Sequence, residues 1–381
     1  MQLKNKKKIV FLSGTRADFG KLKSLINISE KSCLFEVHIF VTGMHLNKKF
    51  GYTIDEIDKE GYKNIFSYKN HQSSSRMDII LSNTIKGFSD YINRLQPDLI
   101  IIHGDRVEAL AGAISGSLNN ILVAHIEGGE ISGTIDELIR HAVTKMSHIH
   151  FVSNKEAANR LKQLGELESS IHIIGSPDLD LMNPKSLPGV DYVLNHYDIN
   201  FKEYALAMFH PVTTEIKTIK NSIKTFVDSL IESNENYILV YPNNDLGSKI
   251  IISEYNRLKN NPKFRIFPSI RFEYFLTLLY SSKFLIGNSS AGIREAPHYN
   301  VPSIDIGTRQ MNRHSGKSII HCGYSKNNIL NAIKKSKNYK LSANNQDKYS
   351  FGSGDSDKRF IKIINKKTFW KTKKQKQFQD N

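Results

Sequence analysis

The sequence predicts an α/β protein with two doubly wound parallel sheets, each flanked by crossover helices. Short β-rich runs alternate with amphipathic helical stretches from the start of the chain to about residue 350. This alternation restarts after residues 184–189, where two prolines and a glycine indicate a linker. A length of 381 residues, at about 150 residues per domain, also favours two domains. We therefore expect two facing domains, with a ligand in the cleft at the carboxyl ends of their strands.

The alternation places each expected element in order along the chain. The first domain, residues 1–183, is expected to contain strands at 9–13, 37–42, 99–103, 122–126, 149–153 and 171–175. The second domain, residues 190–350, is expected to contain strands at 204–209, 238–241, 264–267, 284–287 and 303–306. A C-terminal helix and basic tail, residues 355–381, follow, and Asp355 or Ser356 is expected to cap that helix.

The chain is strongly basic. It has 53 Lys plus Arg against 37 Asp plus Glu, which gives a formal net charge of +16. Nucleic-acid binding would account for this excess, but no helix-turn-helix, zinc-finger or aromatic RNA-binding pattern accompanies it. The lysines concentrate at residues 366–376, which we expect to form a free, solvated tail that catalysis does not need. We therefore expect no nucleic-acid partner.

The spacing of the cysteines and the hydropathy of the chain indicate the cellular compartment. Cys33 and Cys322 lie far apart and outside any Cys-x-x-Cys spacing, which argues against a zinc knuckle or a redox pair. The apolar run 9–12 after the basic start is shorter than the roughly 7–15 residues of a signal sequence. No apolar stretch approaches the about 18 residues that cross a membrane. We expect reduced thiols, no membrane contact and a cytoplasmic protein.

The loop after the first expected strand has the features of an anion site. The segment from Gly14 to Lys21 differs from a nucleotide-hydrolase phosphate loop, because five residues separate its glycines and Leu22 follows the lysine. Arg16 nevertheless lies at a strand-to-helix turn, where its guanidinium and backbone N–H groups can share a phosphate. The alternative is that Arg16 and Asp18 form a surface ion pair and a helix cap.

Acidic residues follow the next buried strands. Asp105 and Glu127 come after adjacent expected strands, so both side chains can reach one substrate. Asp136 lies a few residues further along, where it can also cap the next helix or pair with Arg140 at i, i+4. Three carboxylates in neighbouring loops exceed what caps require, and they predict separate general-acid and general-base roles.

Polar loops also follow the strands of the second half. His210 precedes a proline after an expected strand, which favours a ligand contact over a structural role, and Asn243 follows the next strand. The small residues from Ser289 to Gly292 suit a diphosphate at a helix start. Glu295, one turn further, can accept both hydroxyls of a ribose. The alternative is a helix cap with an acid that the helix dipole favours.

With these loops in this order, the sequence resembles the hydrolysing UDP-N-acetylglucosamine 2-epimerases of sialic-acid biosynthesis, the bacterial NeuC type and its animal counterpart. The resemblance covers nearly the whole chain, from Gly14-Thr15-Arg16-Ala17-Asp18 to Gly307-Thr308-Arg309-Gln310. The sister family of non-hydrolysing epimerases typically has Gly-Thr-Arg-Pro-Glu in the first loop, whereas Ala17-Asp18 follows the arginine here. Arg106 after Asp105, and the stretch Glu127-Gly128-Gly129-Glu130, likewise resemble the hydrolysing branch.

The resemblance implies two Rossmann-like domains in the GT-B arrangement and a UDP-sugar bound in the interdomain cleft. The catalytic group that it implies is Asp105, Glu127, Asp136 and His210. The expected substrate-binding residues are Arg16, Asp18, His45, Arg106, Asn243, Ser289, Ser290, Glu295 and Arg309. Among these, the resemblance implies that Glu295 binds the ribose of UDP.

The implied reaction begins with anti elimination of UDP across C1–C2, which leaves a 2-acetamidoglycal. Water then adds with inversion at C2, so the products are free N-acetylmannosamine and UDP. Neither a metal nor a nicotinamide cofactor is required. Two alternatives stay open: the same chemistry on a UDP-2,4-diacetamido-trideoxy sugar of the legionaminic-acid route, and a GT-B glycosyltransferase that needs an acceptor. We also expect a homo-oligomer, either a dimer or a tetramer.

Overall fold

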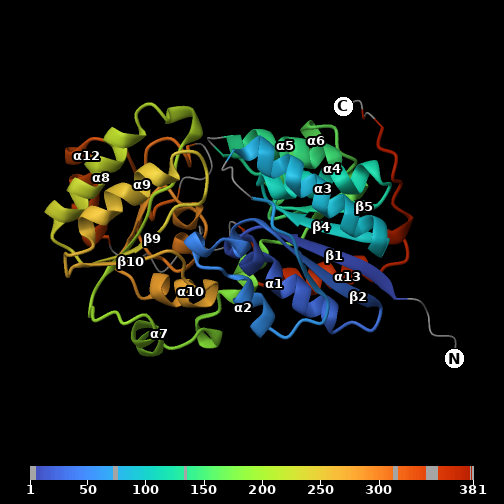
Figure 1. The fold of residues 1–381 in the computed structure, drawn as a ribbon, viewed down its shortest axis with the longest axis horizontal. Helices are drawn as coiled ribbons and strands as arrows, with labels where there is room; N and C mark the ends of the chain where they lie inside the picture. The colour runs from blue at the N-terminus through green and yellow to red at the C-terminus, as the bar shows by residue number, and fades with distance from the viewer. Residues whose placement is uncertain are drawn as a thin grey trace. The chain divides into compact units, whose positions relative to one another are not determined.

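The computed structural model describes residues 6–71, 76–132, 135–311, 316–339, 351–377 and 379. The chain divides into two compact units (Figure 1). Unit 1 comprises Met1–Glu130, Asp136–Leu181 and Phe351–Asn381, and unit 2 comprises Ile131–Ile135 and Met182–Ser350. Each unit is built on one parallel sheet, which confirms the predicted α/β class with two parallel-sheet domains. Part of the expected second domain, residues 340–350, lies outside the described residues.

Unit 1 contains a seven-stranded sheet in the order β3-β2-β1-β4-β5-β6-β7. Its strands are β1 (Lys7–Ser13), β2 (Phe35–Val41), β3 (Ile65–Ser67), β4 (Leu99–His103), β5 (Leu122–Ile126), β6 (Ile149–Val152) and β7 (Ile171–Ile173). The six strands that the sequence predicts are all present, with ends shifted by a few residues at most. The sequence does not predict β3, a short strand at the edge of the sheet, where half-buried side chains give a weak hydrophobic signal.

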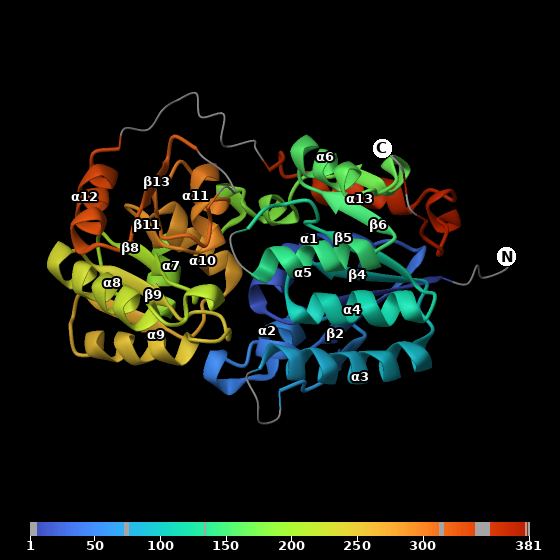
Figure 2. The ribbon, with the colours of Figure 1, turned by 90° about the horizontal axis from the view of Figure 1, so that it is seen from above.

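Helices cover both faces of this sheet. They are α1 (Arg16–Glu30), α2 (Ile54–Lys59), α3 (Met77–Leu95), α4 (Val107–Leu118), α5 (Ile135–Met146), α6 (Lys155–Gln163) and α13 (Ser356–Ile364). Figure 2 shows α1 and α13 on one face and α3 and α4 on the other. A Cβ atom at Gly112 would lie 2.7 Å from Cγ2 of Ile102, so glycine lets α4 approach the sheet closely.

The C-terminal segment 355–381, which the sequence sets apart as a third piece, belongs to unit 1. Phe360 and Ile364 of α13 are fully buried in the core beneath the sheet, and Phe369 is buried beside them. The half-buried ring of Trp370 packs against Phe35 with 6.0 Å between the ring centroids. The expectation of a free, solvated tail is therefore wrong for its described residues, because aromatic side chains anchor it.

The cap of α13 comes from a distant residue. Asp355 occupies the N-cap position but makes no capping bond with its side chain. Instead, the carboxylate of Asp180 accepts the N–H of Ser356 over 2.8 Å and the N–H of Asp357 over 2.9 Å. Burial raises the pKa of Asp180 to about 6, although these donors oppose the shift. The sequence places the start of the helix correctly and misses the residue that caps it.

Unit 2 contains a six-stranded sheet in the order β10-β9-β8-β11-β12-β13. Its strands are β8 (Ala205–Met208), β9 (Tyr237–Val240), β10 (Phe264–Phe267), β11 (Leu285–Gly287), β12 (Ser303–Ile306) and β13 (Ile319–Cys322). Its helices are α7 (Val190–His196), α8 (Ile219–Ser233), α9 (Ser248–Tyr255), α10 (Phe272–Tyr280), α11 (Glu295–His298) and α12 (Lys326–Lys337). The sequence predicts all of these strands except the edge strand β13. No helix in the described part of the chain is long and apolar enough to cross a lipid bilayer.

Replacing Asp180 by alanine should remove the cap of α13. The free energy of unfolding of unit 1 is expected to fall by about 1–2 kcal/mol, the usual cost of losing an N-cap side chain. Urea-induced unfolding near neutral pH measures the loss. Asp355→Ala is the matched control, because the Asp355 carboxylate hydrogen-bonds the exposed side chains of Ser353 and Arg359, and losing these bonds should cost less than about 0.5 kcal/mol. Equal losses in the two variants would contradict the assignment.

Candidate functional site

The expected site residues divide between the two units. Unit 1 holds Arg16, Asp18, His45, Asp105, Arg106, Glu127 and Asp136. Unit 2 holds His210, Asn243, Ser289, Ser290, Glu295 and Arg309. Within each unit these residues follow the carboxyl ends of strands or begin the helix that comes next, which is where parallel α/β sheets bind ligands.

The acidic loops of unit 1 follow two neighbouring strands. β4 and β5 pair in parallel with His103 opposite Ile126, so the residues after them emerge side by side. The N–H of Gly104 donates to the carbonyl of Ile126 over 3.0 Å, which joins the two loops directly. The structure thus brings Asp105 and Glu127 to the same edge of the sheet.

Glu127 has an unusual backbone and two potential cations beside it. Its φ of +71° lies in the left-handed region, which is uncommon outside glycine and is a form of strain found at functional sites. Oε2 of its buried carboxylate lies 2.8 Å from Nε2 of His103 and 3.3 Å from Nζ of Lys21. Nζ of Lys21 also lies 3.9 Å from Oδ2 of Asp178. These neighbours stabilise an ionised Glu127 and include a group, His103, that can exchange a proton with it.

Arg140 of α5 connects the loops that carry the two acids. Its buried guanidinium forms an ion pair with Asp105 and donates from Nη1 to the carbonyl of Glu130 over 3.1 Å. Burial disfavours the charged guanidinium, yet Asp105, followed by Glu127 and Glu130, keeps the pKa of Arg140 above its ordinary value. One edge of the sheet therefore holds two carboxylates in different surroundings, one paired with a guanidinium and one with an ammonium and an imidazole.

Asp136 lies in the first turn of α5, and its side chain is half-buried. The guanidinium of Arg140 pairs with Asp105, and the negative charge of Asp136 also helps to keep the pKa of Arg140 above its ordinary value. The loop residues 133–134, directly ahead of α5, lie outside the described residues. A catalytic role for Asp136 stays a prediction.

The first loop folds around Asp18. Its Oδ2 accepts the N–H of Gly14 over 3.0 Å, and its Oδ1 accepts the N–H of Thr15 over 2.8 Å, in a capping box at the start of α1. Oγ of Ser13 donates to the same carboxylate and lies 3.0 Å from Nε2 of His45. Asp18 therefore orders the loop by occupying backbone donors that a phosphate would otherwise use. Substrate contacts of Asp18 and His45 stay predictions.

Two arginines stand at the same edge of the sheet. Arg16 begins α1 and is half-buried, while Arg106 precedes α4. Nε of Arg106 lies 3.4 Å from Oε2 of the buried Glu108. Glu108 also supports the first loop, because a Cβ atom at Gly14 would lie 2.8 Å from its Cγ. Both arginines thus follow strand ends of unit 1, and phosphate binding by them stays a prediction.

The corresponding edge of unit 2 is organised around His210. The loop after β8 lies between the loops after β9 and β11, its neighbours in the sheet. The N–H of Asn243 donates to Nδ1 of His210 over 3.1 Å. The N–H of His210 donates to Oδ1 of Asn288 over 2.6 Å, and Nδ2 of Asn288 donates back to the His210 carbonyl over 2.9 Å. Because Nδ1 accepts, the neutral imidazole carries its proton on Nε2.

The loop after β11 supplies the remaining expected residues. Ser289 is buried and its Oγ accepts the N–H of Ala291, whereas Ser290 begins a short 3₁₀ turn rather than the expected α-helix. Glu295 is buried at the start of α11. Nη1 of Arg309 donates to the carbonyl of Asn288 over 3.2 Å, which secures the loop from the following strand end. Direct contacts of these side chains with a nucleotide stay predictions.

The pattern that defines the UDP-N-acetylglucosamine 2-epimerase family matches residues 27–365. The chain belongs to that family. It is 47% identical to the UDP-N-acetylglucosamine 2-epimerase of Neisseria meningitidis serogroup B, covering 98% of this chain and 99% of the relative. It is 31% identical to the UDP-N,N'-diacetylbacillosamine 2-epimerase (hydrolyzing) of Legionella pneumophila, covering 94% and 95% of the two chains.

The fold of this epimerase-family chain is similar to solved structures as well. The Methanocaldococcus jannaschii UDP-GlcNAc 2-epimerase in complex with UDP-GlcNAc and UDP superimposes with a TM-score of 0.79 at 21% identity, covering 94% of this chain and 99% of the other. The likeness is one of fold, and it confirms the expected GT-B class with two Rossmann-like domains.

Sequence reasoning misses four side chains that the structure of this family member places at the strand ends. They are Lys21, His103, Arg140 and Asn288. Each lies within a few residues of a motif that the sequence singles out, but its partner is distant in the chain. The signal in the sequence would have been a cationic residue that is predicted to be buried, together with an acid that has no assigned partner. A buried carboxylate requires a compensating charge, so the two can be expected to meet.

Two buried histidines link the stability of unit 1 to pH. Burial lowers the pKa of His45 to about 4 and, despite a hydrogen bond with the carbonyl of Gly104, lowers the pKa of His125 to about 3. Both rings therefore stay neutral in the folded chain near pH 5, whereas an unfolded histidine with a pKa of about 6.5 takes up a proton. Because the unfolded state binds more protons, the free energy of unfolding falls as the pH drops below about 6.5.

Acidification from about pH 7 to about pH 5 should cost roughly 2 kcal/mol for each of these histidines. His125→Gln removes one of them, so this variant should lose about 2 kcal/mol less than the wild type over that interval. Urea-induced unfolding at the two pH values measures both losses. His141→Gln, which replaces a half-exposed imidazole, is the matched control for the loss of a histidine. An unchanged pH dependence in His125→Gln would show that His125 is not held neutral.

Proposed function

We propose that the chain is a hydrolysing UDP-N-acetylglucosamine 2-epimerase, which converts UDP-N-acetylglucosamine and water to N-acetylmannosamine and UDP. The single observation that carries the proposal is the pair Asp105 and Glu127 on adjacent strand ends, each with its own cationic partner. Family membership and the activity named for the Neisseria relative support the same substrate class. The reaction would be the first step of sialic-acid biosynthesis.

The proposed chemistry needs a base and an acid that act in sequence. A carboxylate takes the C2 proton, the electrons of the C2–H bond form the C1=C2 double bond, and the C1–O bond to UDP breaks. Water then forms a C1–O bond and gives a proton to a carboxylate, while a carboxylic acid protonates C2 on the face opposite to the one from which the first proton was taken. Asp105 and Glu127 suit these roles because they lie at adjacent strand ends with different partners, a guanidinium at Asp105 and an imidazole and an ammonium at Glu127. Asp136 is the further acid that we assign to this group.

We assign UDP to the loops of unit 2. Oδ1 of Asn243 is buried and accepts no hydrogen bond in the described part of the chain, so it can accept one from the nucleotide. Nε2–H of His210 can donate to the departing diphosphate. Ser289 and Ser290 offer hydroxyls to the same group, and buried Glu295 can accept both hydroxyls of the ribose.

The hydrolysing branch is favoured over the non-hydrolysing one by the first loop. Ala17-Asp18 follows Arg16, and the capping box that Asp18 makes shows that this acid organises the loop. The Legionella relative is named as a hydrolyzing enzyme for a diacetamido sugar, which makes the UDP-2,4-diacetamido-trideoxy sugar the second candidate substrate. The Neisseria relative, with 47% identity, favours UDP-N-acetylglucosamine.

Incubation of the protein with UDP-N-acetylglucosamine alone in deuterated water tests the proposal. We expect free N-acetylmannosamine with deuterium at C2, together with UDP, because elimination gives the C2 proton to the enzyme and hydration returns one from solvent. Proton NMR identifies both products. A nucleotide-linked product, or hydrogen retained at C2, would contradict the hydrolysing assignment. A parallel reaction with the diacetamido substrate should proceed with the lower kcat/KM.

Glu127→Gln and Asp105→Asn separate chemistry from binding. Each change should lower kcat by about a hundredfold or more, the usual scale for acid–base groups, while the Kd for UDP stays within about twofold. Steady-state kinetics and UDP calorimetry measure the two effects, and thermal unfolding shows whether each variant is folded. A change confined to KM would show that these acids bind the substrate rather than act on it.

Glu295→Ala serves as the contrasting variant in the same experiment. It should weaken UDP binding by about 1–3 kcal/mol, because it leaves the buried ribose hydroxyls without an acceptor. Unchanged UDP affinity in this variant would return Glu295 to a structural role at the start of α11.

A further inference from the structure

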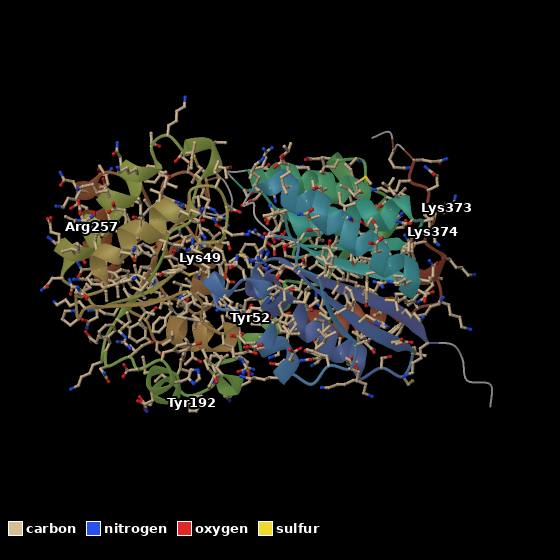
Figure 3. All side chains as sticks on the ribbon, in the orientation of Figure 1. Lys49, Tyr52, Tyr192, Arg257, Lys373 and Lys374 are labelled. Atoms are coloured by element: carbon tan, nitrogen blue, oxygen red, sulfur yellow. The ribbon has the colours of Figure 1, made fainter. Side chains whose placement is uncertain are left out.

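The tail, defined here as residues 366–377, runs along the side of unit 1 where Figure 3 labels Lys373 and Lys374. Its first part is secured by the buried ring of Phe369 and by Nε1 of Trp370, which donates to the carbonyl of Ile364 over 2.8 Å. These contacts hold the beginning of the tail against α13 and β2.

The far part of the tail is anchored at the end of α5. Nζ of Lys376 donates to the carbonyls of Thr144, Lys145 and Ser147 over 3.2, 3.1 and 2.7 Å. The same ammonium lies 2.6 Å from Oε2 of Glu166. A cation at this position satisfies the last carbonyls of the helix and interacts favourably with its dipole. The tail is therefore held on both sides of the segment that carries Lys371 and Lys373.

A cavity of about 630 Å³ lies between the tail and the segments that lead into β6 and β7. Its size falls within the range of about 300–1,000 Å³ that is typical of small-molecule sites. His148 and Ser170 directly precede those strands and line the cavity, so it opens at the amino-terminal edge of the sheet. Asp105 and Glu127 follow the carboxyl ends of the strands in the same sheet. The cavity is therefore separate from the candidate catalytic loops.

The lining of this cavity has an excess of positive charge. Lys366, Lys371 and Lys373 line it, and none of them makes an ion pair in the described part of the chain. The one acid among its described lining residues, Glu166, is already paired with Lys376 and with other cations outside the cavity. An anion in the cavity would therefore meet lysines that have no carboxylate partner of their own in the described part of the chain.

His172 adds a donor to the same wall. It lines the cavity and makes no hydrogen bond in the described part of the chain. Burial, followed by the charge of Lys366, lowers the pKa of His172, which is consistent with a positive field at this point. A bound anion would find a ring N–H there in addition to the three ammonium groups.

We propose that this cavity is a second ligand site, which binds a small phosphate-bearing anion through Lys366, Lys371, Lys373 and His172. Flexible side chains that end in an ammonium point charge, as these three lining lysines do, suit the tetrahedral oxygens of a phosphate. The site does not depend on the proposed epimerase activity, because none of its residues belongs to the strand-end loops.

Trp370 provides the readout, because it is the only tryptophan in the chain and is the neighbour of Lys371. Titration of the full-length protein with inorganic diphosphate, against sodium chloride of equal ionic strength, should give a saturable change in tryptophan fluorescence. A wild-type signal that is linear, or that sodium chloride reproduces, would overturn the proposal.

A matched pair of double variants identifies the cavity as the source of the signal. Lys371→Ala/Lys373→Ala should raise the diphosphate midpoint by about tenfold, equivalent to about 1.4 kcal/mol of binding. Lys362→Ala/Lys367→Ala removes the same charge from two exposed lysines that do not line the cavity, and its midpoint should stay within about twofold of the wild type. Equal shifts in both variants would show a general effect of net charge and overturn the proposal.

Discussion

The ion pair between Arg140 and Asp105 is the interaction on which the candidate site of unit 1 depends. Arg140 comes from α5, Asp105 follows β4, and the carbonyl of Glu130, which the same guanidinium binds, follows β5. One side chain therefore holds together three segments that the chain presents separately. Leaving the buried guanidinium without its carboxylate would lower the free energy of unfolding by about 3–5 kcal/mol, so separation of these loops is strongly disfavoured. The arrangement lets a second acid, Glu127, lie nearby with Lys21 as its own counter-ion.

An amide has the equivalent role in unit 2. Asn288 exchanges two hydrogen bonds with the backbone of His210, and its own carbonyl is held by Arg309 and Gln310. The ring of His210 is oriented in turn by the N–H of Asn243. Because an amide offers both a donor and an acceptor, Asn288 can hold a neighbouring loop without introducing charge. A charged pair in unit 1 and a neutral amide in unit 2 are consistent with the proposed functions of the units, acid–base chemistry on unit 1 and nucleotide binding on unit 2.

Tertiary contacts hold the tail, a charged segment that the sequence predicts to be solvated. A run of lysines with little apolar periodicity is typical of a solvated end, and the sequence predicts one. In the structure, Phe369 enters the core and Lys376 donates to three carbonyls near the end of α5. Carbonyls at the end of a helix lack the full set of intrahelical N–H donors, so they can receive a lysine from a distant part of the chain. The sequence of the tail alone does not indicate that these carbonyls lie close to Lys376.

The sequence by itself determined the fold class, eleven of the strands and the order of the loops that carry polar residues, because burial and periodicity are local properties of the chain. It did not determine the edge strands β3 and β13, which pair on one side only, nor the partners of the buried charges. That Asp105 pairs with Arg140, and that Asp180 rather than Asp355 caps α13, depends on which segments meet in space. Such choices are set by desolvation, since a buried ion or N–H takes whichever partner the packing brings to it.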